Sequence, residues 1–378
     1  MNNRKSFKNI YLDNSATTII SEDVLDAMLP FLKAKFANPS SIHKKGRSTR
    51  SAIDSAREII ALYLNSQIQE IIFTSGGTES NNLAIQGVAK SLKNKGRHII
   101  TSQIEHDSII QCTQSLDEFD ITYLPSDKNG IISPKDLQNA IRKDTILISI
   151  IHAQSEIGTV QDIQTLANIA HENNILFHTD AIQSIKYLDI DVEKLGVDLL
   201  SFGSHKIYGP KGIGGLYVKR GTPITPIFQG SSEYGLRGGT ENTAGIVGFS
   251  KAIELLSKQR EQRYKDVKVL RDFFEELLLK TIKGIKINGK TEKRLPHITN
   301  VYFPKIDNES MLINLDINGI YASGGSACSS LSIEPSHVLK AIGLTNIEAK
   351  HSIRFSLSEM NNRDELIKTV DIIKSIHG

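Results

Sequence analysis

Between about residue 70 and residue 220, short apolar runs alternate with longer segments that have a helical pattern. The apolar runs are rich in β-branched residues and lie at 70–75, 98–103, 121–126, 145–152, 175–180 and 198–203. Amphipathic segments such as 78–92 and 163–174 separate them. Strands that alternate with helices predict a mostly parallel sheet with crossover helices on its faces. The chain is therefore expected to have an α/β fold.

A long amphipathic segment follows this alternating region. Within residues 251–280, the side chains of Val267, Leu270, Phe274 and Leu277 form one stripe when the segment is drawn as a helix. Shorter helical and extended segments then continue to the C-terminus.

This change of pattern predicts a domain boundary near the start of the long helix. Residues 16–250 are expected to form a large domain that contains the parallel sheet. Residues 1–15 and 251–378 are expected to form a smaller α+β domain.

The overall composition argues against several functional classes. The chain has 39% hydrophobic and 23% charged residues, and a formal net charge of only +3 gives no indication of nucleic-acid binding. The two cysteines have no spacing typical of a zinc site, so no metal is expected. No apolar run approaches the ~18 residues that span a bilayer, and the N-terminus lacks an apolar signal core. We therefore expect no membrane association and a cytoplasmic location.

Polar residues follow the predicted strands, at the sheet edge where open parallel sheets bind ligands. Gly76, Gly77 and Thr78 come after the first run, and glycines there let backbone amides approach an anion. The N-terminus of the helix that follows suits a phosphate group. The alternative is an ordinary tight turn in which Thr78 caps the helix.

His106, Asp180 and Gln183 follow further predicted strands. A lone histidine at a strand end, such as His106, is more often structural than catalytic. Asp180 ends an apolar run, and a buried carboxylate is costly unless it is paired. We therefore expect a cationic group to meet Asp180, with a surface position as the alternative.

Lys206 directly follows the run at 198–203, and glycines downstream would allow a ligand to approach closely. A lysine with a lowered pKa in such a place can form a Schiff base, although a solvated loop lysine is the commoner case. A phosphate-binding turn, an imidazole, a carboxylate and a lysine together suit pyridoxal 5′-phosphate (PLP). The helix N-terminus would take the phosphate, Asp180 the ring nitrogen and Lys206 the aldehyde.

Cys328 lies in the stretch 321–335, which is rich in serine and glycine and is typical of a loop. It is one of only two cysteines in the chain. The other, Cys112, is expected to face a helix packing surface. The residues alone leave the role of Cys328 open, and an inert loop thiol is one interpretation.

Over nearly its whole length, the sequence resembles the cysteine desulfurases of the NifS/IscS type, in the PLP-dependent class-V aminotransferase family. The motifs that carry this resemblance are "YLDNSATT", "NPSSIH", "TSGGTESNN", "IEH", "HTDAIQS", "SHKIYGPKGIGGLYV", "LRGGTENTAGIVG" and "GGSACSSLSIEPSHVLKAIG". The resemblance implies the aspartate aminotransferase-type fold of PLP-dependent transferases and a homodimer. That fold agrees with the alternating pattern described above.

The resemblance also implies PLP as the cofactor and assigns its contacts. Lys206 would bind the aldehyde, Asp180 the ring nitrogen and Gln183 the phenolic oxygen. His106 would stack on the ring and move protons. The other implied cofactor contacts are Gly77, Thr78, Ser155, His205 and, from the other subunit, Thr240.

The implied reaction converts L-cysteine to L-alanine, with Cys328, Lys206 and His106 as the catalytic residues. Arg354 would clamp the substrate carboxylate, a bidentate role that suits arginine, and Asn38 would also contact the substrate. The Cys328 thiolate would attack the substrate sulfur and keep it as a persulfide. An acceptor protein, either an iron–sulfur scaffold or a tRNA thiolase, would then receive the sulfur.

The sequence departs from the family pattern at several positions. Ser155 stands where the family commonly has an asparagine, Gly203 where it has a phosphate-binding serine, and Ser232 where it has a glutamine. The family's "SLGRF" is "SLSEM" here. These changes leave open a weakly active or inactive PLP-binding partner or scaffold subunit. A selenocysteine lyase, which differs only in the chalcogen of its substrate, is a further alternative.

Overall fold

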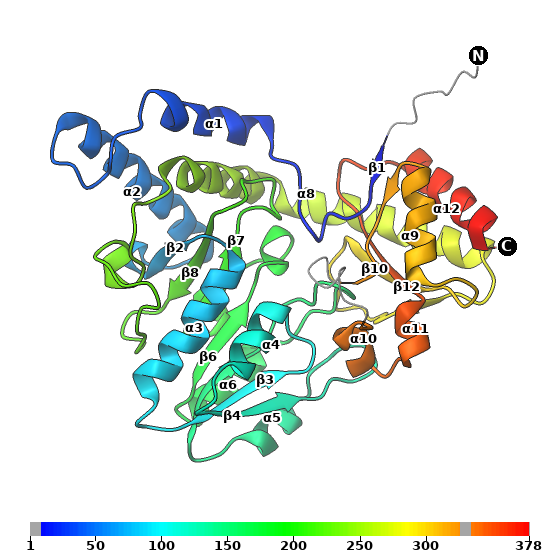
Figure 1. Ribbon diagram of the computed structural model, residues 1–378, viewed down its shortest axis with the longest axis horizontal. Helices are drawn as coiled ribbons and strands as arrows, with labels where there is room; N and C mark the ends of the chain where they lie inside the picture. Colours follow the sequence, from blue (N-terminus) through cyan, green and yellow to red (C-terminus); the bar gives the residue numbers. More distant parts are fainter. Residues whose placement is uncertain (1–8, 326–333, 378) are drawn as a thin grey trace.

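The structure, a computed structural model, describes residues 9–325 and 334–377. A seven-stranded sheet lies at its centre, with helices on both faces (Figure 1). In spatial order its strands are β2 (Ile71–Thr74), β8 (Gly214–Val218), β7 (Leu199–Gly203), β6 (Leu176–Asp180), β5 (Thr145–Ser149), β3 (His98–Ser102) and β4 (Asp120–Leu124). Each apolar run singled out in the sequence overlaps one of these strands, so the predicted α/β class is confirmed.

The sheet is mostly parallel, as predicted. Strands β7, β6, β5, β3 and β4 pair in parallel, whereas β8 runs antiparallel to both of its neighbours. The sequence analysis did not identify β8 as a strand. A Cβ atom on Gly215 would overlap the Phe202 ring of the adjacent strand, so this position needs glycine. The glycines that allow this close packing also obscure the apolar pattern of the strand.

Alternate side chains of the central strands enter two different cores, as expected for strands covered on both faces. Ile100 and Ile148 pack with helices α2 (Lys44–Leu64), α6 (Ile163–Glu172) and the first half of α8 (Thr243–Thr281). Ile99 and Leu147 pack with α3 (Gly77–Leu92) and α4 (Asp107–Gln114) on the other face. Cys112 of α4 is buried in this second layer, as expected.

A separate core surrounds the second half of α8. Its largest element is a three-stranded antiparallel sheet of β9 (Lys286–Asn288), β10 (Ile298–Tyr302) and β12 (Ser352–Ser356). Helices α9 (Asn308–Ile317) and α12 (Arg363–His377) cover it, and β1 (Ile10–Tyr11) pairs with β11 (Ile320–Tyr321) beside it. Val267 and Phe274 are buried here, and Leu270 and Leu277 are partly buried, so the predicted stripe does face a core.

The remaining helices are short or peripheral. They are α1 (Glu22–Lys33), α5 (Pro134–Ala140), α7 (Val192–Leu195), α10 (His337–Ala341), α11 (Asn346–Lys350) and three 3₁₀ turns, η1 (Ile68–Glu70), η2 (Ser184–Lys186) and η3 (Glu233–Gly235). Among the described residues, none of the helices combines the length and the apolar character needed to span a membrane.

Helix α8 runs through the predicted domain boundary without a break. Leu256 still belongs to the core of the large sheet, and Val267 belongs to the core of the small one. Helix α10 also packs Val338 and Leu339 against the large core, and α11 packs Ala349 there, although both helices lie late in the chain. The two cores support a division into a large and a small domain, and the exact limits at 16–250 and at 1–15 with 251–378 remain a proposal.

Candidate active site

A cavity of ≈ 260 Å³ lies at the carboxyl ends of the parallel strands, where the sequence analysis expected a ligand. Its walls come from segments that are far apart in the sequence. The lining residues are Ser15, Ala16, Gly77, Thr78, Asn81, His106, Ser108, Ile151, Ser155, Asp180, Ile182, Gln183, His205, Lys206 and Arg354. Nine of the predicted site residues are therefore brought together: Gly77, Thr78, His106, Ser155, Asp180, Gln183, His205, Lys206 and Arg354.

Three other predicted site residues are not part of this wall. Asn38 is exposed just before α2, and its side chain accepts a hydrogen bond from the amide of Ser40. Thr240 is also exposed and lines a separate hollow with Arg237. Cys328 lies outside the described residues. The roles of these three residues remain predictions.

The first turn of α3 forms one end of the cavity. Helix α3 begins at Gly77, and its N-cap is Gly76, with a φ of 156° and no side-chain cap. The alternative in which Thr78 caps the helix is therefore wrong, because the helix starts one residue before Thr78. Since Gly76 offers no side chain to the amides of the first turn, these donors and the helix dipole can serve an anion.

Asp180 closes β6 and is only 4% exposed. Its two carboxylate oxygens accept hydrogen bonds from the Asn81 side-chain amide, at 2.8 Å, and from the Ile182 backbone amide, at 2.9 Å. Two neutral donors thus meet this carboxylate, and the expected cationic partner remains a prediction. Because Asp180 also lines the cavity, its remaining lone pairs can receive a protonated ring nitrogen from a ligand.

His106 caps helix α4 and faces the same cavity. Its Nδ1 accepts a hydrogen bond from the Ser108 amide at 3.1 Å and lies 2.8 Å from the Ser108 hydroxyl. Because a backbone amide can only donate, the neutral imidazole carries its proton on Nε2. Burial lowers the pKa of His106, and the charge of Lys206 lowers it further, so the ring is held neutral.

A chain of hydrogen bonds connects this imidazole to the buried carboxylate. Ser108 accepts a hydrogen bond from Asn81 at 2.9 Å, and the same Asn81 amide donates to Asp180. The sequence analysis missed Asn81 and Ser108. Asn81 lies one helical turn after Gly77 within the quoted "TESNN" motif, so a helical projection could have placed it at the cavity.

The turn after β7 carries His205 and Lys206. The segment that precedes α1 holds this turn, since Thr18 donates to the His205 carbonyl at 2.9 Å and Thr17 Oγ1 lies 3.2 Å from His205 Nδ1. Burial lowers the pKa of His205 to about 4, and the charges of Lys206 and Lys211 act in the same direction. His205 is therefore a neutral hydrogen-bonding group at neutral pH.

Arg354 and Gln183 are oriented by the N-terminal segment. Arg354 is 1% exposed, and its two terminal nitrogens bond to Asp13, at 2.7 Å, and to the Ser155 carbonyl, at 3.1 Å. The buried Nε has no hydrogen-bond partner among the described residues. Gln183 donates to the Ser15 carbonyl at 2.9 Å. Asp13 and Ser15 were also missed, although both belong to the quoted "YLDNSATT" motif.

The Ile182 side chain occupies the space next to Gly203. A Cβ atom on Gly203 would lie 3.2 Å from Ile182 Cδ1, and one on Gly77 would lie 2.6 Å from the same atom. Ile182 thus fills the wall between the two glycines. The neighbouring Ser204 is fully buried, its hydroxyl has no partner among the described residues, and a Cβ on Gly209 would overlap it. Ser204 therefore faces away from the cavity.

Among the other departures from the family pattern, Ser155 lines the cavity, whereas Ser232 lines a different hollow with Arg57 and Tyr234.

Within residues 9–325 and 334–377, no group of three or more histidine, cysteine or acidic side chains is arranged to hold a metal ion.

Comparison with known proteins places the chain in a family. Residues 10–368 match the aminotransferase class-V family. The chain is 50% identical over 372 residues to a protein of Dictyoglomus turgidum named cysteine desulfurase IscS, a match that covers 98% of this chain and 94% of the relative. A cysteine desulfurase IscS of Methanosarcina thermophila is 47% identical over 372 residues, covering 98% and 92% of the two chains. The chain belongs to the class-V aminotransferase family.

Solved structures agree with this assignment and with the predicted fold. A NifS-like protein superimposes with a TM-score of 0.92 at 34% identity, covering 98% of this chain and 99% of the other. A structure described as SspA in complex with cysteine superimposes with a TM-score of 0.82 at 39% identity, covering 92% of this chain and 99% of the other. The aspartate aminotransferase-type fold inferred from the resemblance is therefore confirmed.

Proposed function

We infer that the chain is a cysteine desulfurase, which converts L-cysteine to L-alanine and passes the sulfur to a protein thiol. One observation in the structure carries this inference. The cavity gathers Lys206, Asp180, His106 and Arg354 from four separate segments, and its size suits a small amino acid bound beside a cofactor. The full-length similarity to proteins named cysteine desulfurase agrees with that arrangement.

We propose PLP as the cofactor, because the donors present suit each of its polar groups. The uncapped amides at the start of α3 and the His205 side chain suit the phosphate. Asp180 suits the ring nitrogen, Gln183 the phenolic oxygen and Lys206 the aldehyde. Bound PLP supplies an electron sink for the bonds around the substrate's α-carbon.

The chain's own residues then divide the remaining work. Arg354 binds the substrate carboxylate, with Asp13 and the Ser155 carbonyl fixing the plane of its guanidinium group. His106 holds a proton on Nε2 at the cavity wall and can deliver it to the substrate or to the leaving product. Lys206, which lines the same cavity, would hold the cofactor by its aldehyde.

Cys328 is proposed as the sulfur acceptor within the chain. It takes the substrate sulfur as a persulfide while alanine is released. The described residues on both sides of it support this role, since the chain enters and leaves the segment 326–333 next to the cavity. Ser336 donates to the Glu156 carboxylate at 2.7 Å, a Cβ on Gly325 would lie 3.4 Å from the same carboxylate, and Glu156 follows Ser155 of the cavity wall.

A homodimer is proposed on the basis of exposed apolar side chains and of two residues that do not line the cavity. Large hydrophobic side chains are exposed on and around α1 and α2 and near η3: Ile19, Leu32, Phe36, Ile42, Leu62, Phe228 and Tyr234. Apolar surface of this kind is typical of subunit interfaces. Burial against a second copy would let the exposed Asn38 and Thr240 complete the partner's cavity.

The sulfur acceptor and the cellular location follow from the proposed activity. A persulfide on Cys328 requires a thiol of a second protein, for which we propose an iron–sulfur scaffold or a tRNA thiolase in the cytoplasm. The two alternatives, an inactive partner subunit and a selenocysteine lyase, are not favoured, because the named relatives are cysteine desulfurases.

One assay tests the proposed activity. The purified protein, supplied with PLP and L-cysteine, should release alanine and, with a thiol reductant, sulfide in equal amounts. Absence of alanine under these conditions would support the partner-subunit alternative. A strong preference for selenocysteine over cysteine would support the lyase.

A further inference from the structure

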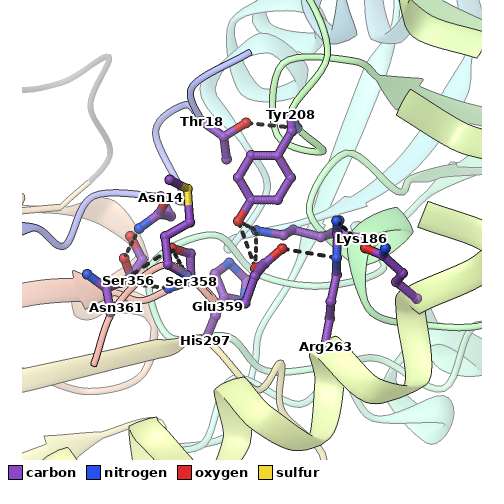
Figure 2. A network of polar contacts seen from close by, with 12 residues as sticks. Asn14, Thr18, Lys186, Tyr208, Arg263, His297, Ser356, Ser358, Glu359 and Asn361 are labelled. Atoms are coloured by element: carbon purple, nitrogen blue, oxygen red, sulfur yellow. Dashed lines mark hydrogen bonds and ion pairs between the residues drawn. The ribbon is translucent and has the colours of Figure 1, made fainter. Parts of the chain in front are cut away.

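Lys186, Tyr208, Arg263 and Glu359 form a cluster of charged and phenolic side chains (Figure 2). Glu359 is at its centre. Its carboxylate accepts a hydrogen bond from the Tyr208 hydroxyl at 2.7 Å and pairs with Arg263 at 3.0 Å. Lys186 donates to the same hydroxyl at 3.0 Å and lies 3.8 Å from the carboxylate. None of these residues lines the cavity.

The cluster is sufficiently buried that an unpaired charge within it would be costly. The Lys186 side chain is 3% exposed and that of Glu359 is 22% exposed. Burial lowers the pKa of Lys186 to about 8, and the charge of Glu359 opposes this effect. The Lys186 ammonium also lies 4.3 Å from the centre of the Tyr208 ring. Removal of the carboxylate would leave two cations facing each other without a counter-charge, a costly arrangement in a poorly solvated place.

Three members of the cluster are close in sequence to residues of the cavity. Lys186 is three residues after Gln183, Tyr208 is two residues after Lys206, and Glu359 is five residues after Arg354. Arg263 comes from α8, on the part of that helix that passes from the large core to the small one. One carboxylate therefore connects the segments that carry the cofactor-binding and substrate-binding side chains.

The Tyr208 backbone is fixed in an unusual conformation for a residue with a side chain, with a φ of 66°. The Thr18 hydroxyl accepts from the Tyr208 amide at 2.9 Å, and the Ser21 amide donates to its carbonyl at 3.0 Å. This conformation directs the phenol toward Glu359, away from solvent. A non-glycine residue at positive φ is maintained only when surrounding contacts hold it there.

Hydrogen bonds on either side of Leu357 also hold the segment that carries Glu359 (Figure 2). Asn14 donates to the Ser356 carbonyl at 2.9 Å, and the Ser358 amide donates to Asn361 at 2.9 Å. The chain from β12 to Glu359 is therefore short and constrained, so a shift at Glu359 would be transmitted to Arg354. Glu359 also stands where the "SLGRF" pattern has an arginine, which would place a third cation beside Lys186 and Arg263.

We propose that Glu359 is a positioning residue, which sets the distance between Arg354 and the Lys206 turn by holding β12 against Tyr208, Lys186 and Arg263. This inference rests on the proposed desulfurase function, because Arg354 is taken to bind the cysteine carboxylate. Glu359 touches neither substrate nor cofactor. Glu359 influences the position of Arg354 through β12, and the position of Lys206 through Tyr208 in the turn after β7.

The test compares three variants of the PLP-loaded enzyme. Glu359→Gln removes the charge and keeps the shape, Tyr208→Phe removes one hydroxyl, and Glu276→Gln changes an exposed carboxylate on α8 as the matched control. Because a displaced Arg354 would bind the cysteine carboxylate less well in the ground state and in the transition state alike, we expect Glu359→Gln to raise the KM for cysteine by about 10- to 100-fold. Its kcat and PLP content should stay near those of the control.

A second measurement is independent of activity. Hydrogen–deuterium exchange should be faster in peptides covering residues 204–212 and 352–360 of Glu359→Gln, and both peptides should change together. The double variant Tyr208→Phe, Glu359→Gln should be impaired by less than the sum of the two single effects, since both changes weaken the contact between Tyr208 and Glu359.

An unchanged KM in Glu359→Gln overturns the proposal, even if the melting temperature falls, because the cluster would then be purely structural. An unchanged exchange rate in either peptide overturns it as well. If the unmutated enzyme makes no alanine from cysteine, the proposed function fails, whereas the paired exchange result still decides whether Glu359 couples the two segments.

Discussion

The guanidinium group of Arg354 lies 2.7 Å from the carboxylate of Asp13, a residue 341 positions away in the sequence. The pair joins β12 to the segment that follows β1 and aligns the arginine at the cavity wall. A buried arginine without this partner would keep its charge but lose its orientation. The substrate carboxylate is therefore expected to meet a guanidinium group that is already fixed in place.

Replacement of Arg354 by alanine should raise the KM for cysteine strongly. Loss of a charged hydrogen-bonding partner costs on the order of 2–4 kcal/mol, which is roughly 30- to 1,000-fold in affinity. Asp13→Asn, which keeps the arginine and weakens its anchor, should give a smaller increase. Steady-state kinetics with cysteine measures both values. An unaltered KM in Arg354→Ala would mean that another residue binds the carboxylate.

Replacement of Lys206 by alanine should abolish the absorbance of covalently bound PLP while the protein remains folded. No other lysine lines the described cavity, so no second amine is expected to take over. Lys211→Ala is the matched control, because this lysine is five residues away in the same loop. Absorbance spectra and reduction with borohydride followed by peptide mapping check the result. Label at Lys211 would refute the assignment of Lys206.

Cys328→Ser should keep the bound-PLP absorbance and still bind cysteine, but it should form neither persulfide nor alanine at the normal rate. Cys112→Ala is the control, since it removes the only other thiol in the chain. Cys112 belongs to α4, and its side chain is buried in the core that this helix covers, with 4% of the residue exposed. Burial raises the pKa of its thiol to about 11. It is therefore uncharged and inert at neutral pH. Mass spectrometry of the persulfide distinguishes the two sites.

Much of the fold could be predicted from the sequence, because strands buried on both faces give continuous apolar runs. Within the seven-stranded sheet, the exception was β8, whose pattern is diluted by Gly214 and Gly215. The strand-end residues of the site could also be predicted, since the carboxyl ends of parallel strands meet at one edge. A helical projection from Gly77 could have placed Asn81 at the cavity, but Asp13 and the Glu359 cluster could not be found in this way. Their roles depend on contacts between distant segments, which no local pattern encodes.

A shared cavity can be tested with mixed dimers. If Thr240 completes the partner's site, a dimer of one Lys206→Ala subunit and one Thr240→Val subunit has one intact site and one site with both changes. Co-expressed, doubly tagged heterodimers should therefore regain about half of the normal activity, as expected for one of two independent sites. The two parental homodimers serve as controls. A monomer in sedimentation that binds PLP at full strength would contradict the proposed dimer.

The last prediction concerns Gly203, where a serine could donate a hydrogen bond to the phosphate group of the proposed PLP cofactor. Such a bond to a charged acceptor contributes roughly 1.5–3 kcal/mol, or about 10- to 150-fold in affinity. Gly203 closes β7 and is absent from the positions with positive φ, so its backbone accepts a side chain. The new Cβ would lie 3.2 Å from the flexible end of Ile182, which has to move by a few tenths of an ångström.

Gly203→Ser should accordingly tighten PLP binding, measured as the rate of PLP loss from the purified enzyme. Ser204→Ala should leave that rate unchanged, because the Ser204 hydroxyl is buried away from the cavity and has no hydrogen-bond partner among the described residues. Removal of an unpaired buried hydroxyl should even stabilise the fold slightly, by up to about 1 kcal/mol. Faster PLP loss from Ser204→Ala, with no gain in Gly203→Ser, would show that Ser204 rather than position 203 contacts the phosphate.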